Sequence, residues 1–380
     1  MKKIVFLAVA AFLSAAYVCA SAQTAQQLKY YDVKECGFPV VNQGFDDCTD
    51  YYGRLSVDMK DKVRESVWSL ARNTAGVAVR FRSDARAIGV KWTLISAFRM
   101  NHMAASGICG CDLYGYDEGE WKYVGTARPG NGKENMARFR NMIDGKMREY
   151  VIFLPLYDGV TSLAIGVDEG ATVEMPGEIG ANPFGGKASK PIVFFGHSIT
   201  QGGCASRPGM AATNILCRKL GREVINLGFS GNGQLYSVMA EELVKIDAGA
   251  YVLDCLANNY LDMTRDSTEK FVRTIVNARP QTPLYFVSMY PNVTPWVGDN
   301  TETEQEGKDA VFREMCATLK SEGYKTYFID LNGPGRNRRN PLEGSSAGAD
   351  GEVTVDGGHL TDLGFLRLAE FLYPYFKKVK

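Results

Sequence analysis

Three residues of the sequence could act together as a nucleophile, a base and an acid. Ser198 stands in the run Gly196-His197-Ser198-Ile199-Thr200-Gln201-Gly202, whose glycines permit a tight turn with an exposed hydroxyl. Serine is a poor nucleophile at its free pKa, so it needs a base, and histidine is the usual one. His359 follows Asp356 across a Gly-Gly turn, which lets one short loop aim the carboxylate at Nδ1 while Nε2 faces a hydroxyl. The spacing makes Ser198, His359 and Asp356 candidates for a catalytic triad.

Each member of this triad also has a purely structural interpretation. Ser198 could be a turn or helix-cap residue, His359 a loop residue and Asp356 a turn former. Of the other two histidines, His197 adjoins the serine, and His102 lies in the first half of the chain and is treated as background. The chemical interpretation therefore depends on elements that bring distant residues together.

The second half of the sequence alternates short apolar runs with helix-length segments. The runs at 192–195, 224–227, 251–255, 284–288 and 326–330 are typical of buried parallel strands. Helices are predicted at 210–220, 238–246, 268–278 and 304–319, and a last helix, capped by Thr361, should end near Phe376. This alternation favours an α/β fold with a doubly wound parallel sheet. Such sheets bind ligands at the carboxyl ends of their strands, which is where Ser198 lies.

The first half shows a different pattern, in which short runs of alternating apolar and polar residues are separated by polar turns, with little helix. Strands are predicted at 76–81, 87–94, 111–116, 121–126, 149–156 and 162–167. Regular short strands of this kind indicate an antiparallel β-sandwich, of jelly-roll type. Between 175 and 190 the composition shifts to Gly, Pro, Ala, Ser and Asn, as expected of a linker.

The first 22 residues have the order of a secretory signal peptide. Lys2 and Lys3 precede an apolar run from Ile4 to Val18, which is shorter than the ~20 residues of a membrane span, and small residues follow. We therefore expect a signal peptide at 1–22, a β-sandwich accessory domain at 23–174, a linker at 175–190 and a catalytic domain at 191–380. The expected location is the periplasm, the medium or the cell surface.

Composition narrows the range of partners. The 43 basic and 43 acidic residues nearly balance after Lys2 and Lys3 are removed, with no block of like charge, so nucleic acid and anionic membranes are poor candidates. No later segment is apolar enough to span a bilayer. In an oxidising compartment some cysteines could pair, Cys36 with Cys48 for instance. Cys109-Gly110-Cys111 lacks the spacing of a zinc site, and we predict no metal and no cofactor.

Four short blocks of the sequence, taken in order, resemble the signature blocks of the SGNH/GDSL hydrolases, in particular of two-domain bacterial members with a strand-rich first domain. The first block of that family matches Gly196 to Gly202, with His197 where Asp is usual. The second matches 226–232, with Gly231 as the counterpart of the family glycine. The third matches 256–259, which keeps Asn258 but departs at Leu256 and Asn259, and the last matches 356–359.

The resemblance implies a flavodoxin-like SGNH domain and an oxyanion hole beside the triad. The implied donors are the backbone N–H groups of Ser198 and Gly231 and the side-chain amide of Asn258. A side chain at Gly231 would crowd the oxyanion, which would explain the glycine. Arg207 could reach substrate, but a solvated or structural role is the simpler interpretation. Asp254 is expected to fix the Asn258 loop by hydrogen bonds, with simple burial as the alternative.

The expected function is an exported serine esterase that removes small acyl groups, acetyl in particular, from carbohydrate. No long apolar segment resembles the lid of a lipase. The alternatives are a non-catalytic carbohydrate-binding protein on an inherited hydrolase fold, or a thioesterase or lipase-like acylhydrolase with the same triad. The expected partner is a small-molecule or polysaccharide ester, and the sequence makes no prediction of the oligomeric state.

Overall fold

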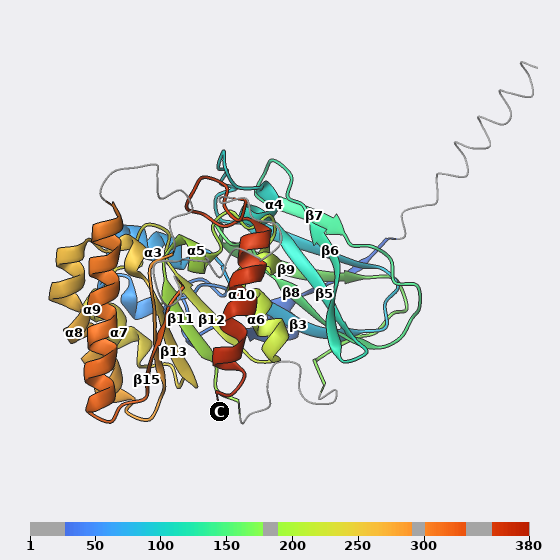
Figure 1. The fold of residues 1–380 in the computed structure, drawn as a ribbon. Coiled ribbons are helices and arrows are strands. Elements are labelled where there is room, and N and C mark those ends of the chain that lie inside the picture. Colours follow the sequence, from blue (N-terminus) through green and yellow to red (C-terminus); the bar gives the residue numbers. More distant parts are fainter. Residues whose placement is uncertain (1–26, 178–188, 291–300, 332–351, 380) are drawn as a thin grey trace, which may run out of the picture.

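The computed structural model describes residues 27–177, 189–290, 301–331 and 352–379, without the side chains of 301 and 302. The expected signal peptide and most of the expected linker lie outside the described residues. Figure 1 shows two sheet systems side by side, one antiparallel and one parallel. The fold class is as predicted, an α/β unit preceded by a β-sandwich.

The β-sandwich consists of two antiparallel sheets. One has the order β1-β9-β4-β7, and the other has the order β10-β3-β8-β5-β6 with β2 paired to β3. Their bounds are β1 Lys29–Asp32, β2 Val40–Val41, β3 Ala78–Ser83, β4 Ile88–Leu94, β5 Cys111–Asp117, β6 Glu120–Ala127, β7 Glu134–Arg138, β8 Arg148–Phe153, β9 Val160–Val167 and β10 Val173–Glu174. Large side chains such as Trp92, Phe81 and Phe153 are fully buried and form the core of this unit.

The parallel sheet has five strands in the order β12-β11-β13-β14-β15. The bounds are β11 Ile192–Gly196, β12 Val224–Gly228, β13 Ala250–Asp254, β14 Leu284–Val287 and β15 Thr326–Ile329, close to the five predicted runs. Every pair is parallel, and β11 lies between β12 and β13. The strand order reverses at β11, so the carboxyl end of β11 is the switch point at which a ligand site is expected.

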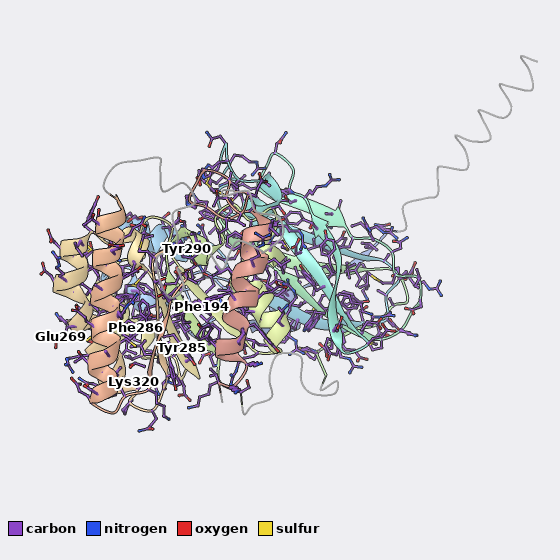
Figure 2. The ribbon with its side chains drawn as sticks, viewed as in Figure 1. Phe194, Glu269, Tyr285, Phe286, Tyr290 and Lys320 are labelled. Carbon is purple, nitrogen blue, oxygen red and sulfur yellow. The ribbon has the colours of Figure 1, made fainter. Side chains whose placement is uncertain are left out.

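Helices cover both faces of the parallel sheet, because alternate strand residues point to opposite faces. α6 Ala212–Leu220 and α10 Asp362–Phe376 lie between this sheet and the sandwich, whereas α7 Ser237–Leu243, α8 Leu261–Ala278 and α9 Thr301–Ser321 cover the other face (Figure 1). Phe194 packs edge-on against Phe376 of α10, with ring centroids 5.5 Å apart. Phe286 packs edge-on against Phe312 of α9, with ring centroids 5.2 Å apart. Figure 2 labels the two strand residues, Phe194 and Phe286.

Helix starts were predicted less well than the strands of the parallel sheet, and the runs predicted for the sandwich did not include β1, β2, β7 and β10. α8 begins at Leu261, seven residues before the predicted start at Thr268. Its first two turns carry no apolar stripe, because the buried positions there are Thr264 and Thr268. Each threonine hydroxyl donates to the carbonyl four residues earlier, at 3.0 and 2.6 Å, which satisfies the hydroxyl inside the core. At α10 the Thr361 side chain accepts from Gly364 N at 3.4 Å, which confirms the predicted cap.

A segment of the first half packs beneath the parallel sheet rather than in the sandwich. Its helix α3, Glu65–Ala71, contributes Val67 and Trp68 to the same buried cluster as Phe229 and Met239. Within this segment the buried Arg54 donates to Asn226 O at 3.1 Å and Gly228 O at 2.6 Å at the end of β12. The sequence-based expectation of an almost purely stranded first half missed this packing.

Two further observations concern cysteines and helices in the described part of the chain. The eight cysteines there are free thiols, so no disulfide joins Cys36 to Cys48. No described helix is both long enough and apolar enough to cross a bilayer.

Candidate active site

The nucleophile turn begins where β11 ends. Ser198 is the first residue of α5, Ser198–Gln201, and it is largely buried. Gly196 must be glycine, because a Cβ there would lie 2.0 Å from Thr200 Oγ1 and 2.4 Å from Asp254 O. This close approach of strand and helix places the Ser198 side chain at the switch point of the sheet.

The structure brings Ser198, His359 and Asp356 together in one hydrogen-bonded chain. Ser198 Oγ lies 2.9 Å from His359 Nε2, and His359 Nδ1 lies 2.8 Å from Asp356 Oδ2. The second carboxylate oxygen accepts from the backbone N–H of His359 at 2.7 Å and of Gly358 at 3.1 Å. With the proton held on Nδ1, the Nε2 lone pair is available to accept from the serine hydroxyl.

Asp356 is ionised across the physiological range. Partial burial would raise the pKa of this carboxyl, but the backbone and side-chain hydrogen bonds from His359, together with the Gly358 N–H and the histidine charge, outweigh it and lower the pKa to about 2. The loop itself is closed by Val355 N, which donates to His359 O at 2.8 Å. The acid and the base are therefore held as one short unit.

The two other predicted site residues stand on loops at neighbouring strand ends. Gly231 adopts a φ of +68°, and a Cβ there would meet no protein atom within 4 Å. The left-handed backbone is by itself a reason for glycine at this position, and a Cβ there would point into open space rather than against a protein group. Asn258 Oδ1 accepts from Gly233 N at 3.1 Å, which leaves both N–H bonds of its amide to donate.

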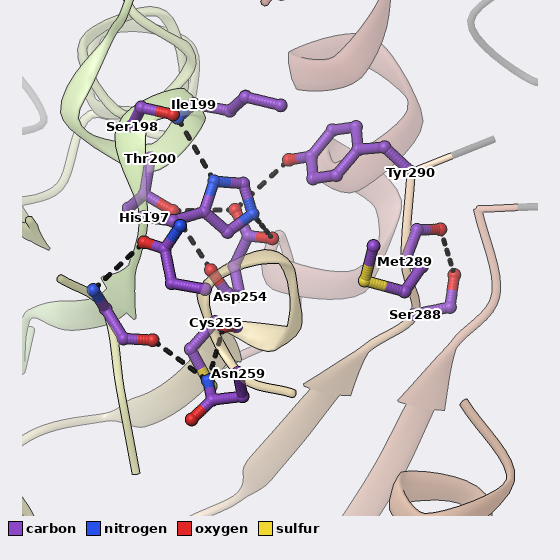
Figure 3. A network of polar contacts seen from close by, with 12 residues as sticks. His197, Ser198, Ile199, Thr200, Asp254, Cys255, Asn259, Ser288, Met289 and Tyr290 are labelled. Carbon is purple, nitrogen blue, oxygen red and sulfur yellow. Dashed lines mark hydrogen bonds and ion pairs between the residues drawn. The ribbon is translucent and has the colours of Figure 1, made fainter. Parts of the chain in front are cut away.

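A buried polar network lies directly behind the nucleophile turn (Figure 3). His197 Nδ1 accepts from Ile199 N at 3.2 Å, and its Nε2 lies 3.5 Å from Asp254 Oδ1. Asp254 Oδ2 accepts from Thr200 Oγ1 at 2.6 Å and from the Tyr290 hydroxyl at 3.1 Å. Asp254 therefore fastens the nucleophile turn, whereas we had expected it to fix the Asn258 loop.

The electrostatics of this network keep Asp254 charged. Burial would raise the pKa of the Asp254 carboxyl, but the His197 charge and the hydrogen bonds from His197, Thr200 and Tyr290 lower the pKa below its ordinary value. Tyr290 shows the opposite effect, because burial and the Asp254 charge raise the pKa of its phenol. The network is thus a carboxylate surrounded by donors.

Asn259, rather than Asp254, fixes the Asn258 loop. Its Nδ2 donates to Gly233 O at 3.1 Å and to Cys255 O at 2.8 Å, while its Oδ1 accepts from Leu235 N at 3.1 Å. An amide can donate and accept at once, which a carboxylate cannot. The partners of Asn259 therefore suit an amide, which explains why this sequence has Asn where the family usually has Asp.

The β-sandwich contributes side chains that sequence reasoning missed. Tyr157 donates to Ser198 O at 3.3 Å, and the rings of His102 and His359 have centroids 5.9 Å apart. Gln201, just after the serine, donates to Leu156 O at 3.0 Å and accepts from Ser230 N at 2.9 Å. No local signal marks these contacts, because each joins residues that are far apart in the sequence.

A buried ion pair joins the two units beside the nucleophile loop. Arg207 donates to Asp112 Oδ2 at 2.7 Å and to the Tyr114 hydroxyl at 2.6 Å, and Gly209 N donates to the same carboxylate oxygen at 2.8 Å. The predicted structural role for Arg207 is consistent with these bonds. The Asp112 carboxyl has no side-chain exposure, so this pair anchors the loop rather than facing substrate.

One sulfur lies close to the catalytic imidazole. Cys204 adopts a φ of +74°, and one ligand atom from each of His102, Cys204 and His359 lies within 4.8 Å of the other two. Burial, followed by the Asp356 charge, raises the pKa of the Cys204 thiol to about 11. At neutral pH Cys204 is therefore a thiol and not a competing nucleophile.

Comparison with known families divides the chain into two matches. The pattern of the GDSL-like Lipase/Acylhydrolase family matches residues 189–377. The pattern named GxDLY, the N-terminus of the SGNH-hydrolase-type esterases, matches residues 28–173. The letters of that name stand at Gly110, Asp112, Leu113 and Tyr114. Asp112 and Tyr114 are the residues that bind Arg207.

Solved structures resemble the chain over nearly its whole length. A GDSL-like lipase from Bacteroides ovatus is 30% identical, with a TM-score of 0.81, and the match covers 93% of this chain and 98% of that one. The salicylyl acyltransferase SsfX3 of a tetracycline biosynthetic pathway is 14% identical, with a TM-score of 0.70 and coverage of 90% and 95%.

A family two carbohydrate esterase from Clostridium thermocellum is 11% identical, with a TM-score of 0.56 and coverage of 90% and 98%. At these lower identities the likeness concerns the fold alone. No curated protein matches the chain.

Proposed function

Because this chain belongs to the GDSL-like lipase/acylhydrolase family, we propose that it is a serine esterase that removes small acyl groups, acetyl in particular, from carbohydrate. The observation that carries the proposal is the 2.9 Å contact of Ser198 Oγ with His359 Nε2, backed by Asp356 on Nδ1. In the same proposal residues 191–380 carry the chemistry, residues 23–174 shape the rim of the site, and residues 175–190 connect them.

The proposed reaction begins with attack of Ser198 Oγ on the ester carbonyl carbon. His359 Nε2 takes the hydroxyl proton as the new C–O bond forms, and Asp356 stabilises the resulting imidazolium. When the tetrahedral intermediate collapses, the imidazolium gives its proton to the departing sugar oxygen, which leaves an acyl-serine. Water, deprotonated by the same histidine, then releases the carboxylic acid and restores the serine.

Negative charge on the carbonyl oxygen needs donors that are already in place. The N–H groups of Ser198 and Gly231 and the amide of Asn258 are the proposed set. Asn258 is oriented for this role because its Oδ1 is already occupied by Gly233 N. Fixed donors of this kind stabilise the transition state without rearrangement.

Two features support carbohydrate as the substrate and export as the route. The two-unit fold is shared with family two carbohydrate esterases from Clostridium thermocellum and Cellvibrio japonicus, although only as a fold. The first 22 residues have the composition of a signal peptide, which suits an enzyme that meets polymers outside the cytoplasm. A thioester or lipid ester would use the same triad, so substrate choice needs direct assay.

The test compares the mature protein with its Ser198→Ala variant. Turnover of p-nitrophenyl acetate should be readily measurable in the former and lost in the latter. Equal, near-zero turnover in both would favour a non-catalytic carbohydrate-binding protein. Acetate release from acetylated xylan, pectin and mannan, measured alongside a thioester and a long-chain ester, then decides the substrate class.

A further inference from the structure

Three side chains that are remote in the sequence bring metal-binding atoms together beside the catalytic serine. His102 belongs to the loop after β4, Cys204 follows the nucleophile helix α5, and His359 belongs to the loop before α10. One ligand atom of each lies within 4.8 Å of the other two. Two imidazoles and one thiolate form a ligand set that zinc accepts in proteins.

Both histidines are oriented as metal ligands usually are. Asp356 Oδ2 lies 2.8 Å from Nδ1 of His359, and Asn101 Oδ1 lies 3.0 Å from Nδ1 of His102. An acceptor at Nδ1 holds the ring proton there and leaves the Nε2 lone pair free to coordinate. This outer contact, above all with a carboxylate, is the common support of zinc-binding histidines.

The backbone at Cys204 gives an independent reason to attribute a role to its side chain. Its φ of +74° lies in the left-handed region, which residues with a Cβ rarely adopt. Glycine would occupy this position without strain, and the two preceding residues are glycines. A cysteine kept at such a conformation, buried and next to the catalytic loop, suggests that the sulfur has a use.

We propose that His102, Cys204 and His359 form a binding site for Zn²⁺ that switches the enzyme off. Bond lengths of about 2.0–2.3 Å place tetrahedral ligand atoms roughly 3.3–3.8 Å apart, so the cluster needs to contract by about an ångström. His102 is exposed on a loop and can supply this movement. On binding, the Cys204 proton leaves to solvent, and a water molecule completes the coordination.

Inhibition follows from competition for one electron pair. Nε2 of His359 takes the proton of Ser198 in the proposed reaction, and the same lone pair would bind zinc. An enzyme with zinc bound would therefore lack its base. The inhibitory effect rests on the proposed esterase function, whereas the binding of metal does not.

The experiment measures binding and activity separately on the mature protein. Co²⁺, a spectroscopic substitute for Zn²⁺, should give a near-ultraviolet thiolate-to-metal band and tetrahedral visible bands, which added Zn²⁺ abolishes. Zn²⁺ should also inhibit p-nitrophenyl acetate hydrolysis, and EDTA should reverse the inhibition. Cys204→Ser and His102→Ala should keep their basal activity but bind zinc more weakly. The loss of zinc affinity should exceed the roughly 10–100-fold that follows when a residue that only hydrogen-bonds a metal ligand is removed.

Cys48→Ser is the matched control, because it removes a half-buried thiol in another part of the fold. Its cobalt spectrum and zinc inhibition should equal those of the wild type. A cobalt complex without a thiolate band, or equal zinc affinity in wild type, Cys204→Ser and His102→Ala, would overturn the site. A normal thiolate band in a protein without esterase activity would keep the metal site and reject the proposed function instead.

Discussion

Within the described part of the chain there are two histidine–aspartate pairs, and they differ mainly in exposure. The side chains of His197 and Asp254 are 2% and 8% exposed, whereas those of His359 and Asp356 are 33% and 41% exposed. The buried pair is 3.5 Å apart and surrounded by further donors, and the exposed pair is 2.8 Å apart with Nε2 on Ser198. The buried pair therefore holds the nucleophile turn in place, whereas the partly exposed pair is arranged to move a proton.

This difference follows from what each environment does to a charge. A buried carboxylate with several donors is costly to disturb, so it fixes its neighbours but exchanges no proton with substrate. A partly exposed pair can admit substrate and water, and its ion pair adds little to folding. Perturbing the two pairs should therefore give opposite results in activity and in stability.

The largest expected effect is on catalysis at the exposed pair. His359→Gln should lower kcat by roughly 10⁶-fold, the scale found when the base of a triad is removed. Its free energy of unfolding should stay close to that of the wild type. The assay is p-nitrophenyl acetate turnover with urea unfolding of the same samples. His197→Gln is the matched variant, and a comparable loss of kcat there would contradict the division of roles.

The next effect is on stability at the buried pair. Asp254→Ala leaves His197 and the Tyr290 and Thr200 hydroxyls without their shared acceptor, so the free energy of unfolding should fall by about 3–5 kcal/mol. Asp356→Ala should cost less than about 1 kcal/mol, because that pair is partly exposed. Denaturant melts of the two variants make the comparison. Equal losses would show that burial does not separate the pairs.

A smaller effect on rate is expected at the proposed oxyanion donor. Asn258→Ala should lower kcat roughly 100-fold, or about 3 kcal/mol of transition-state stabilisation, with little change in KM. Asn259→Asp, one residue away, should act differently, since it removes the donor to Gly233 O and Cys255 O and so weakens folding as well. Kinetics and thermal melting on both variants distinguish a donor from a scaffold residue.

The smallest effect is the acid dependence of stability. The Asp356 pKa of about 2 in the folded protein lies below the roughly 3.9 of an unfolded aspartate, so the ionised group stabilises the fold above pH ~4. That contribution is lost as the pH falls towards 2. Unfolding free energies of the wild type and Asp356→Asn should differ slightly at pH 6 and converge in acid. A difference that grew on acidification would reverse the sign of the linkage.

The sequence was informative where function and structure were local. The strands of the parallel sheet carry short, mostly apolar runs, and Asp356 lies three residues before His359, so the strands and a candidate acid–base pair could be recognised from neighbouring residues. The contact of Ser198 with His359 could be expected because the carboxyl ends of parallel strands meet at one edge of the sheet. The resemblance to a known family supplied Gly231 and Asn258, which no local pattern marks.

What could not be predicted depends on contacts between the halves of the chain. His102 and Tyr157 come from loops of the sandwich, and nothing near them in the sequence points to Ser198 or His359. Asp254 was assigned to the wrong loop, because its partners His197 and Tyr290 come from two other strand ends. Such pairings are set by tertiary packing, which sequence periodicity does not encode.

The guanidinium of Arg54 has an evolutionary consequence. It comes from the first half of the chain, yet its donors bind carbonyls at the end of β12, inside the second half. A gene fragment beginning near residue 189 would encode the parallel sheet without the Arg54 contacts and without helix α3, which carries Trp68 and covers one face of that sheet. We therefore expect the two halves to be inherited together. If the hydrolytic half is fused to another module, we expect insoluble protein unless residues 43–75 are included in the fusion.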